Sequence, residues 1–164
     1  MITLQPITET NFLTAAALSV SPDQGRYVAP APIILARAYA YRRHRASAWG
    51  VYDGCRMVGL ALMEDLDEEP ACYHLSELLI DEKEQGKGYG QAALALLLTQ
   101  CRREGKYRRV EVCVKRKDAA AIHVYEKAGF RGYGLHRSGH ARQPVHGLEP
   151  PGNLEGGCGT PSDL

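Results

Sequence analysis

The chain has 164 residues, 45% of them hydrophobic, and a formal net charge of +1, which suits one domain with one hydrophobic core. So small a charge gives no field that would gather nucleic acid or an anionic membrane, and we expect neither as a partner. The five cysteines are scattered without a Cys-x-x-Cys pair, and no apolar run reaches the ~20 residues that span a bilayer, so we expect a cytoplasmic protein with no metal site and no disulfide framework.

The first third of the chain predicts a strand, two helices and a hairpin. Residues 2–7 alternate like a short edge strand, and apolar residues within 12–20 recur at helical spacing after a run of N-capping residues. A second helix is expected over 33–41, after two proline-containing breaks. Residues 47–63 then form two antiparallel strands around Asp53-Gly54, a dipeptide favoured in tight hairpin turns.

An acidic run follows the hairpin, with five acids in the six residues 64–69. As an exposed loop this run needs no function. If it overhangs a cleft, however, it would attract a polycationic amine. Glu68 and Glu69 are the residues that we expect to carry this attraction.

Residues 73–80 predict a strand that is half polar before it becomes aliphatic, which is typical of a strand whose front part reaches a cleft. His74 and Glu77 are its candidates for proton transfer. With strict alternation these two side chains lie on opposite faces of the strand. Each also has a structural alternative, Glu77 as a solvated or salt-bridged residue and His74 as a hydrogen-bonded imidazole at the edge of the core.

A glycine-rich turn joins this strand to a helix-forming run over 91–101. Glycines allow positive φ and close approach of a ligand, while the first turn of a helix exposes unpaired N–H groups and the positive end of its dipole. This arrangement predicts a phosphate or pyrophosphate site, or else a helix-entry turn without a ligand. The turn has neither the Lys-Ser/Thr pair of a P-loop nor the spacing of a dinucleotide fingerprint. Its residues are Gln85, Gly86, Lys87, Gly88, Tyr89 and Gly90.

The last predicted elements are a strand and a helix. Residues 110–114 alternate as a strand, and Asp118 then opens a helix that its side chain can cap. Tyr125 lies seven residues beyond Asp118, which places both on one helix face. After Phe130 the pattern ends, because residues 131–164 are rich in glycine and proline and poor in aliphatic residues, which predicts disorder.

Two of these segments carry a family resemblance. The turn at 85–90 resembles the pyrophosphate loop Gln/Arg-x-x-Gly-x-Gly/Ala of the GCN5-related N-acetyltransferases (GNAT), and residues 118–130 resemble a second signature of that family. Residues 20–30, with the alanine-rich helix after them, are similar to bacterial spermine/spermidine acetyltransferase-like proteins. The resemblance extends over residues 2–133.

The resemblance implies a fold and a domain organisation. An α/β (α+β) acyltransferase fold is expected, with a mixed, mostly antiparallel sheet, helices on both faces and two splayed strands that hold acetyl-CoA. Residues 1–133 are expected to form the N-acetyltransferase domain and residues 134–164 a disordered tail. The tail lacks the further strand that family members have, which would expose a sheet edge and favour completion by a second copy, as a homodimer.

The resemblance also implies roles for the site residues. It assigns the coenzyme to the turn at 85–90 and to Asp118, and the thioester carbonyl to backbone N–H groups around Leu79 and Ile80. Tyr125 would protonate the departing coenzyme A thiolate.

Acetyl transfer to an amine requires a neutral amine, so a base must take its proton, and Glu77 and His74 both stay open for that role. A primary amine of spermidine or spermine is the expected acceptor. If the chain is an acetyltransferase for another amine, an aminoglycoside or a protein N-terminus is the alternative acceptor. A non-catalytic coenzyme A-binding module is a further alternative, because Asp118 stands where the family has asparagine and the C-terminal part departs from the family pattern.

Overall fold

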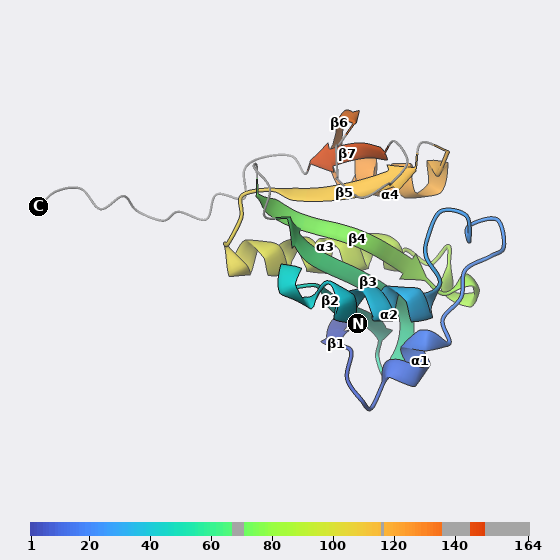
Figure 1. Ribbon diagram of the computed structural model, residues 1–164. Coiled ribbons are helices and arrows are strands. Elements are labelled where there is room, and N and C mark those ends of the chain that lie inside the picture. Colours follow the sequence, from blue (N-terminus) through green and yellow to red (C-terminus); the bar gives the residue numbers. More distant parts are fainter. Residues whose placement is uncertain (67–70, 116, 136–144, 150–164) are drawn as a thin grey trace, which may run out of the picture.

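The structure, a computed structural model, describes residues 1–66, 71–115, 117–135 and 145–149. These residues build one sheet of seven strands in the order β1-β2-β3-β4-β5-β7-β6 (Figure 1). All neighbours pair antiparallel except β4 and β5, which are parallel, so the expected mixed, mostly antiparallel sheet is confirmed. The strands are β1 (Ile2–Pro6), β2 (Ser47–Asp53), β3 (Arg56–Leu66), β4 (Cys72–Ile80), β5 (Val110–Lys115), β6 (Arg131–Leu135) and β7 (Val145–Glu149).

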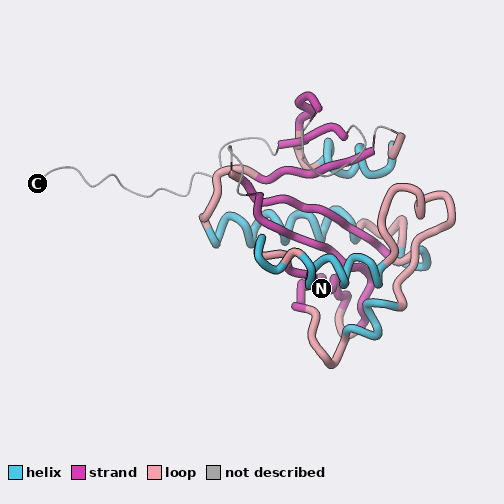
Figure 2. The backbone as a smooth tube through the Cα atoms, in the orientation of Figure 1, coloured by secondary structure: helices cyan, strands magenta, loops and turns pink. Residues whose placement is uncertain are grey.

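Helices cover both faces of the sheet, as expected (Figure 2). On one face α1 and α2 pack against β3 and β4, where Ile34 contacts the cluster of Leu60, Leu62 and Leu79. On the other face α3 and α4 bury the larger part of the core together with Val110 and its neighbours on β5. The helices are α1 (Phe12–Ala16), α2 (Ala31–Ala40), α3 (Tyr89–Glu104) and α4 (Ala119–Lys127), with short 3₁₀ helices at Arg42–His44 and Glu82–Glu84.

The hairpin between β2 and β3 is confirmed, with Gly54 at φ +60° in the turn. The second helix begins earlier than expected, at Ala31, because Pro32 fits the first helical turn, where no N–H is needed. The first helix is shorter than the expected 12–20 and ends at Ala16. Short helices of this kind depend on packing, and Ala15 supplies it as a fully buried residue.

The acidic run is only partly a loop. β3 continues to Leu66, so Glu64 and Asp65 lie on the strand, 8% and 6% exposed, and the expectation of an exposed loop is wrong for both. They are stabilised there by the partners described below. Glu68 and Glu69 lie outside the described residues, so their attraction for a polyamine stays a hypothesis.

A bulge in β4 corrects the expected orientation of His74 and Glu77. His74 pairs with Glu64 and Glu77 with Leu62, and the register between β3 and β4 shifts between these pairs. Positions 62 and 64 share one face of β3, so their partners on β4 share it too. Strict alternation placed His74 and Glu77 on opposite faces. The extra residue of the bulge brings both to the face covered by α1 and α2.

β4 and β5 diverge after a short contact. They pair only from Tyr73 to Leu75 on β4 and from Val110 to Val112 on β5, while the other edge of β5 pairs with β7 from Val112 to Lys115 (Figure 1). The splayed strands expected from the resemblance are therefore present.

The sheet continues past β5, which corrects the expectation for the C-terminal part. Residues 131–135 and 145–149 form β6 and β7, and β7 pairs antiparallel with β5. The expectation of no further strand is wrong for these two segments, while residues 136–144 and 150–164 lie outside the described residues. The division of the chain at residue 133 stays a prediction.

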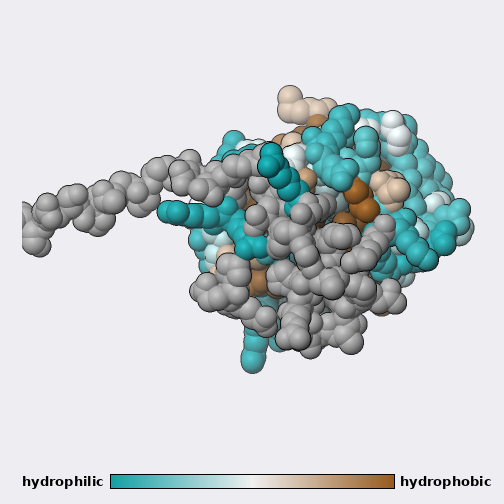
Figure 3. Space-filling view, turned by 90° about the horizontal axis from the view of Figure 1, so that it is seen from above, coloured by the Kyte–Doolittle hydropathy of each residue, from teal (hydrophilic) through white to brown (hydrophobic). Residues whose placement is uncertain are grey.

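Seen from above the view of Figure 1, the described surface is mainly hydrophilic, with a small apolar patch among polar groups (Figure 3). Among the described helices, none combines the length and the apolar composition needed to cross a membrane.

Candidate functional site

The glycine-rich turn opens α3 with the backbone geometry that the sequence predicts. Gly86 and Gly88 have φ of +77° and +81°, a region that residues with a Cβ rarely adopt, and Gly88 is the N-cap of α3. α3 is 16 residues long, so a full helix dipole ends at this turn. The turn is therefore suited to an anion such as a pyrophosphate.

The side chains of the turn have structural partners. Gln85 Nε2 donates to the Ile80 carbonyl oxygen at 2.9 Å and to Gln24 Oε1 at 2.7 Å, which fixes the turn to the end of β4. Lys87 Nζ lies 2.8 Å from Glu84 Oε2. Tyr89 donates its hydroxyl proton to Asp53 Oδ2 at 2.7 Å, on the hairpin behind α3. The backbone of the turn, more than its charged and aromatic side chains, is thus available to a ligand.

A pocket of about 150 Å³ lies where β4 departs from β5. Its lining comes from four parts of the chain: the connection between α1 and α2, the end of β4, the glycine-rich turn, and α4 with its N-cap. The predicted site residues in its lining are Ile80, Gln85, Gly90, Asp118 and Tyr125. Leu79 points instead into the core cluster with α1 and α2, so only its backbone can serve a ligand in the pocket.

Tyr27 and Val28 also line this pocket. They come from the connection between α1 and α2. Val28 packs against the core cluster of that face, and both residues close one side of the pocket.

Tyr125 reaches the pocket from α4 and is 8% exposed. Burial, followed by the negative charges of Glu77 and Asp118, raises the pKa of its phenol, so the hydroxyl is protonated over the whole physiological range. Its ring packs edge-on against Phe130 at 5.7 Å. The side chain is therefore held in place, and at physiological pH its hydroxyl can donate a hydrogen bond or a proton.

Asp118 caps α4, as the sequence predicts. Its Oδ1 accepts a hydrogen bond from the Ala121 N–H at 3.1 Å. The carboxylate thus satisfies a free N–H group of the helix while it lines the pocket.

Glu77 is held by an arginine that the sequence did not single out. Arg37 Nη1 of α2 lies 2.5 Å from Glu77 Oε1, and the Ala29 N–H donates to Oε2 at 3.3 Å. Arg37 Nη2 is also 3.9 Å from Glu64 Oε1. One cation on α2 therefore serves two carboxylates on the sheet, with Arg37 and Glu77 only 16% and 14% exposed at the side chain.

His74 belongs to a buried polar cluster with Glu64 and Ser76. Its Nδ1 lies 3.1 Å from Glu64 Oε1 and 3.0 Å from Ser76 Oγ, and Ser76 donates its hydroxyl proton to the same glutamate oxygen. Burial raises the pKa of Glu64, but hydrogen bonds from His74 and Ser76 outweigh it and lower that pKa to about 2. Burial likewise opposes the imidazolium, yet hydrogen bonding with Cys113 and Glu64 raises the pKa of His74 to about 9.

Three members of this site were missed in the sequence. Arg37 is a lone cation in an apolar helix, a pattern that signals a buried charge partner. Glu64 was assigned to the acidic loop, although the alternation of β3 could have been extended to it. Ser76 gives no signal, because its position follows from the bulge.

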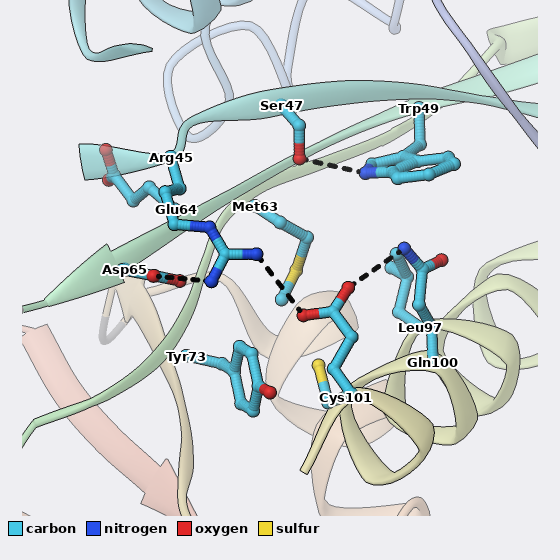
Figure 4. Close-up of a pocket in the computed structure, with 11 residues that line it drawn as sticks. Arg45, Ser47, Trp49, Met63, Glu64, Asp65, Tyr73, Leu97, Gln100 and Cys101 are labelled. Atoms are coloured by element: carbon cyan, nitrogen blue, oxygen red, sulfur yellow. Dashed lines mark hydrogen bonds and ion pairs between the residues drawn. The ribbon is translucent and has the colours of Figure 1, made fainter. Parts of the chain in front are cut away.

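A second, smaller pocket of about 50 Å³ lies on the opposite face, against the C-terminal half of α3. Asp65 points into it toward Arg45, with Nη1 and Oδ2 3.5 Å apart, whereas Glu64 points away from it (Figure 4). Lys106 Nζ also contacts Asp65 Oδ2, at 2.5 Å, and Arg45 Nη2 lies 3.9 Å from Glu104. These ion pairs tie α3 to the sheet, which is a structural role. Within the described part of the chain, no three potential metal ligands lie together.

Solved structures similar to this chain include acetyltransferases that bind coenzyme A. The aminoglycoside acetyltransferase AAC(6')-Ib in complex with coenzyme A has a TM-score of 0.75 at 17% identity, over 92% of this chain and 95% of that one. The spermidine N-acetyltransferase from Vibrio cholerae in complex with CoA and spermine has a TM-score of 0.66 at 15% identity, over 90% and 92%.

Curated relatives and a family match complete the comparison. The spermine/spermidine N(1)-acetyltransferase of Bacillus subtilis (strain 168) is 27% identical over 133 residues, which are 79% of this chain and 88% of that protein. The Acetyltransferase (GNAT) family matches residues 14–130. That match covers most of the described fold, including both strands of the splay and the glycine-rich turn, and the chain therefore belongs to the GNAT acetyltransferase family.

Proposed function

We propose that this acetyl-CoA-dependent N-acetyltransferase transfers its acetyl group to a primary amine of a polyamine, spermidine or spermine. The observation that carries the proposal is the pocket between β4, the glycine-rich turn and α4, with Tyr125 in its lining. Support for the acceptor comes from the relatives named for spermine and spermidine.

The pocket suits the two ends of acetyl-CoA. The positive φ of Gly86 and Gly88 and the start of α3 suit its pyrophosphate, since both leave backbone N–H groups and a positive dipole end for an anion. The gap between β4 and β5 suits the extended pantetheine arm of acetyl-CoA. These strands stop pairing with each other after Leu75 and Val112, so their facing edges leave backbone groups that can hydrogen-bond to the arm. Acetyl-CoA supplies the activated acetyl thioester there.

The chain has groups for each proton that the reaction moves. The attacking amine must lose a proton, because an ammonium has no lone pair for the carbonyl. His74, with its pKa near 9, already holds a proton at neutral pH, so we assign proton acceptance at that pH to Glu77. Tyr125 then protonates the departing thiolate, and backbone N–H groups around Leu79 and Ile80 stabilise the oxyanion, typically by ~3 kcal/mol.

The charges on the α2 face balance. Arg37 lies within ion-pair distance of Glu77 and Glu64, and His74, which is protonated at neutral pH, also pairs with Glu64, so two carboxylates meet two cations. The polyamine assignment therefore rests on the relatives and not on the charge of this group.

A thiol-release assay with acetyl-CoA and spermidine tests the proposal. Tyr125→Phe removes only the hydroxyl and is expected to lower kcat by about 10²-fold or more, the usual contribution of general acid catalysis. Tyr39→Phe is the matched control, since Tyr39 is 71% exposed on α2 and is expected to leave the rate unchanged.

The screen includes an aminoglycoside and a peptide with a free N-terminus, each at the same concentration as spermidine. Preferred turnover of either one would overturn the polyamine assignment. Retained acetyl-CoA binding without turnover of any amine would make the chain a coenzyme A-binding module.

A further inference from the structure

Residues 20–28 between α1 and α2, which we call the strap, lie across the open end of the splay between β4 and β5. On one side Gln24 Oε1 accepts a hydrogen bond from Gln85 Nε2 at 2.7 Å, in the glycine-rich turn that follows β4. On the other side the Arg26 carbonyl oxygen accepts from Nζ of Lys115, the last residue of β5. The strap thus joins the two strands at the end where they no longer pair, and it forms one wall of the pocket.

Both ends of the strap are fixed to β4 and to the segment that follows it. Just before the strap, the Ser19 N–H donates to Asp81 Oδ2 at 3.1 Å, and the Ser19 carbonyl oxygen accepts from the Glu82 N–H at 2.8 Å. Just after the strap, the Ala29 N–H donates to Glu77 Oε2 at 3.3 Å. These two positions are the hinges about which the strap can move.

The strap keeps its own shape through internal hydrogen bonds. The N–H groups of Gln24 and Gly25 both donate to the Ser21 carbonyl oxygen. The Tyr27 N–H in turn donates to the Gln24 carbonyl oxygen, at 2.8 Å. No residue from 20 to 28 is buried, so little apolar burial holds the strap against the sheet. It can therefore lift as one body once the two contacts in its middle break.

The pocket under the strap is small for the ligand that the fold implies. Its volume is about 150 Å³. Pockets that enclose small molecules and cofactors typically measure ~300–1,000 Å³. The arm of acetyl-CoA enters through the gap between β4 and β5, which is the gap that the strap crosses. Entry of the arm therefore requires the strap to lift.

We propose that the strap is a gate for acetyl-CoA, held closed by the contacts of Gln24 with Gln85 and of Lys115 with the Arg26 carbonyl. The gate opens to admit the arm into the splay and closes again over it. Both contacts are made before and after binding and are broken only during passage, so Gln24 and Lys115 are positioning residues that set the rates of entry and release rather than the affinity. The proposal rests on the proposed acetyl-CoA site.

Surface plasmon resonance of acetyl-CoA over the immobilised full chain tests the gate. Gln24→Ala removes the acceptor for Gln85, and Lys115→Met removes the donor for the Arg26 carbonyl. Each variant is expected to raise kon and koff together by roughly fivefold, which corresponds to one partly exposed hydrogen bond, and to leave Kd within about twofold of the wild type.

Two variants serve as matched controls and are expected to leave both rate constants unchanged. Asp23→Ala changes a strap residue whose side chain is 93% exposed and pairs only with Arg26 of the same strap. Lys117→Met removes an exposed lysine two residues beyond Lys115.

Unchanged rate constants in either Gln24→Ala or Lys115→Met would overturn the gate. A Kd that rises while kon stays constant would overturn it too, because the contacts would then only shape the bound site. The thiol-release assay with spermidine on the same samples separates the two proposals. Spermidine turnover with unaltered rate constants sinks the gate alone, and altered rate constants without spermidine turnover sink only the polyamine assignment.

Discussion

Two buried residues, Glu64 and His74, carry opposite charges in the same cluster, and each depends on the other for its charge. Glu64 has its pKa lowered to about 2 against the opposing effect of burial, and His74 has its pKa raised to about 9. A buried ion pair contributes little when both charges are present, but loss of one charge leaves the other without compensation. The stability of the protein should therefore change with pH at both ends.

The expected pH dependence follows from these directions. His74 contributes stability that is fully present below its usual pKa of 6.5 and is lost as pH rises through about 9. Glu64 contributes stability that is present above its usual pKa of 4.5 and is lost as pH falls toward about 2. The free energy of unfolding, measured by chemical denaturation from pH 3 to pH 10 in steps of about one pH unit, reports both limbs.

One variant tests the alkaline limb. His74→Gln should flatten the alkaline limb and also weaken the acid limb, because His74 is the first group that lowers the pKa of Glu64. His123→Gln is the control, because His123 is an exposed residue of α4. An alkaline limb of equal slope in the wild type and in His74→Gln would contradict the charge assignment of the cluster.

At the level of single residues, the sequence predicts a residue's role correctly where that role depends on a single helix or turn. The cap at Asp118 and the positive φ of Gly86 and Gly88 follow from the sequence, because helix ends and tight turns restrict their own residues. The partnership of Arg37 with Glu77 joins residues 40 positions apart, and nothing local encodes it.

At the level of elements, the bulge in β4 decides which side chains meet. Alternation predicts a face by counting residues, and one inserted residue reverses the result for everything beyond it. The sequence of β4 has no glycine or proline to mark the insertion. The position of the bulge is evident only from the register of β4 against β3, and that register depends on both strands.

Gly59 of β3 shows how closely that pairing fits. A Cβ at Gly59 would lie 2.5 Å from the Leu79 carbonyl oxygen and 3.5 Å from the Ile80 Cα, which are backbone atoms of β4. Gly59→Ala is therefore expected to lower the free energy of unfolding by about 2 kcal/mol, since the strands must separate to accept the methyl group. Because this shift moves the end of β4 that lines the pocket, acetyl-CoA affinity should fall as well.

Thermal unfolding and acetyl-CoA titration of Gly59→Ala check this expectation. Gly90→Ala serves as the steric control for stability, because its Cβ would meet only Ile80 Cγ1, at an ordinary 3.8 Å, and alanine favours the helix. Equal unfolding free energies for the wild type and Gly59→Ala would show that the strands tolerate the methyl group.

β6 and β7 were not predicted for a related reason. Each is five residues long and contains glycine, so neither has a strong strand pattern of its own. Their pairing with β5 and with each other supplies what the local sequence lacks. In β6 and β7, which lie in the glycine- and proline-rich part of the chain, pairing with other strands outweighs the weak strand propensity of the local sequence.

At the scale of the whole molecule, the sheet separates two kinds of interior. The α3 and α4 face is largely aliphatic and aromatic, whereas the α2 face holds Arg37, Glu64, His74 and Glu77 beside its apolar cluster. Most helices and strands and the backbone geometry of the glycine-rich turn were predictable, because periodicity and glycine chemistry are local, whereas the fold class came from the family resemblance. The splay of β4 from β5 came from the family resemblance, and the polar face emerged only from the assembled sheet.

The central claim is that acetyl-CoA occupies the pocket between β4, the glycine-rich turn and α4. Hydrogen–deuterium exchange of the full chain, with and without acetyl-CoA and without an amine, tests it most directly. We expect slower exchange in residues 78–92 and 118–125, and no change in residues 46–49, which line a separate open groove between α2 and β2. Protection confined to residues 46–49, with residues 78–92 unaffected, would contradict the account.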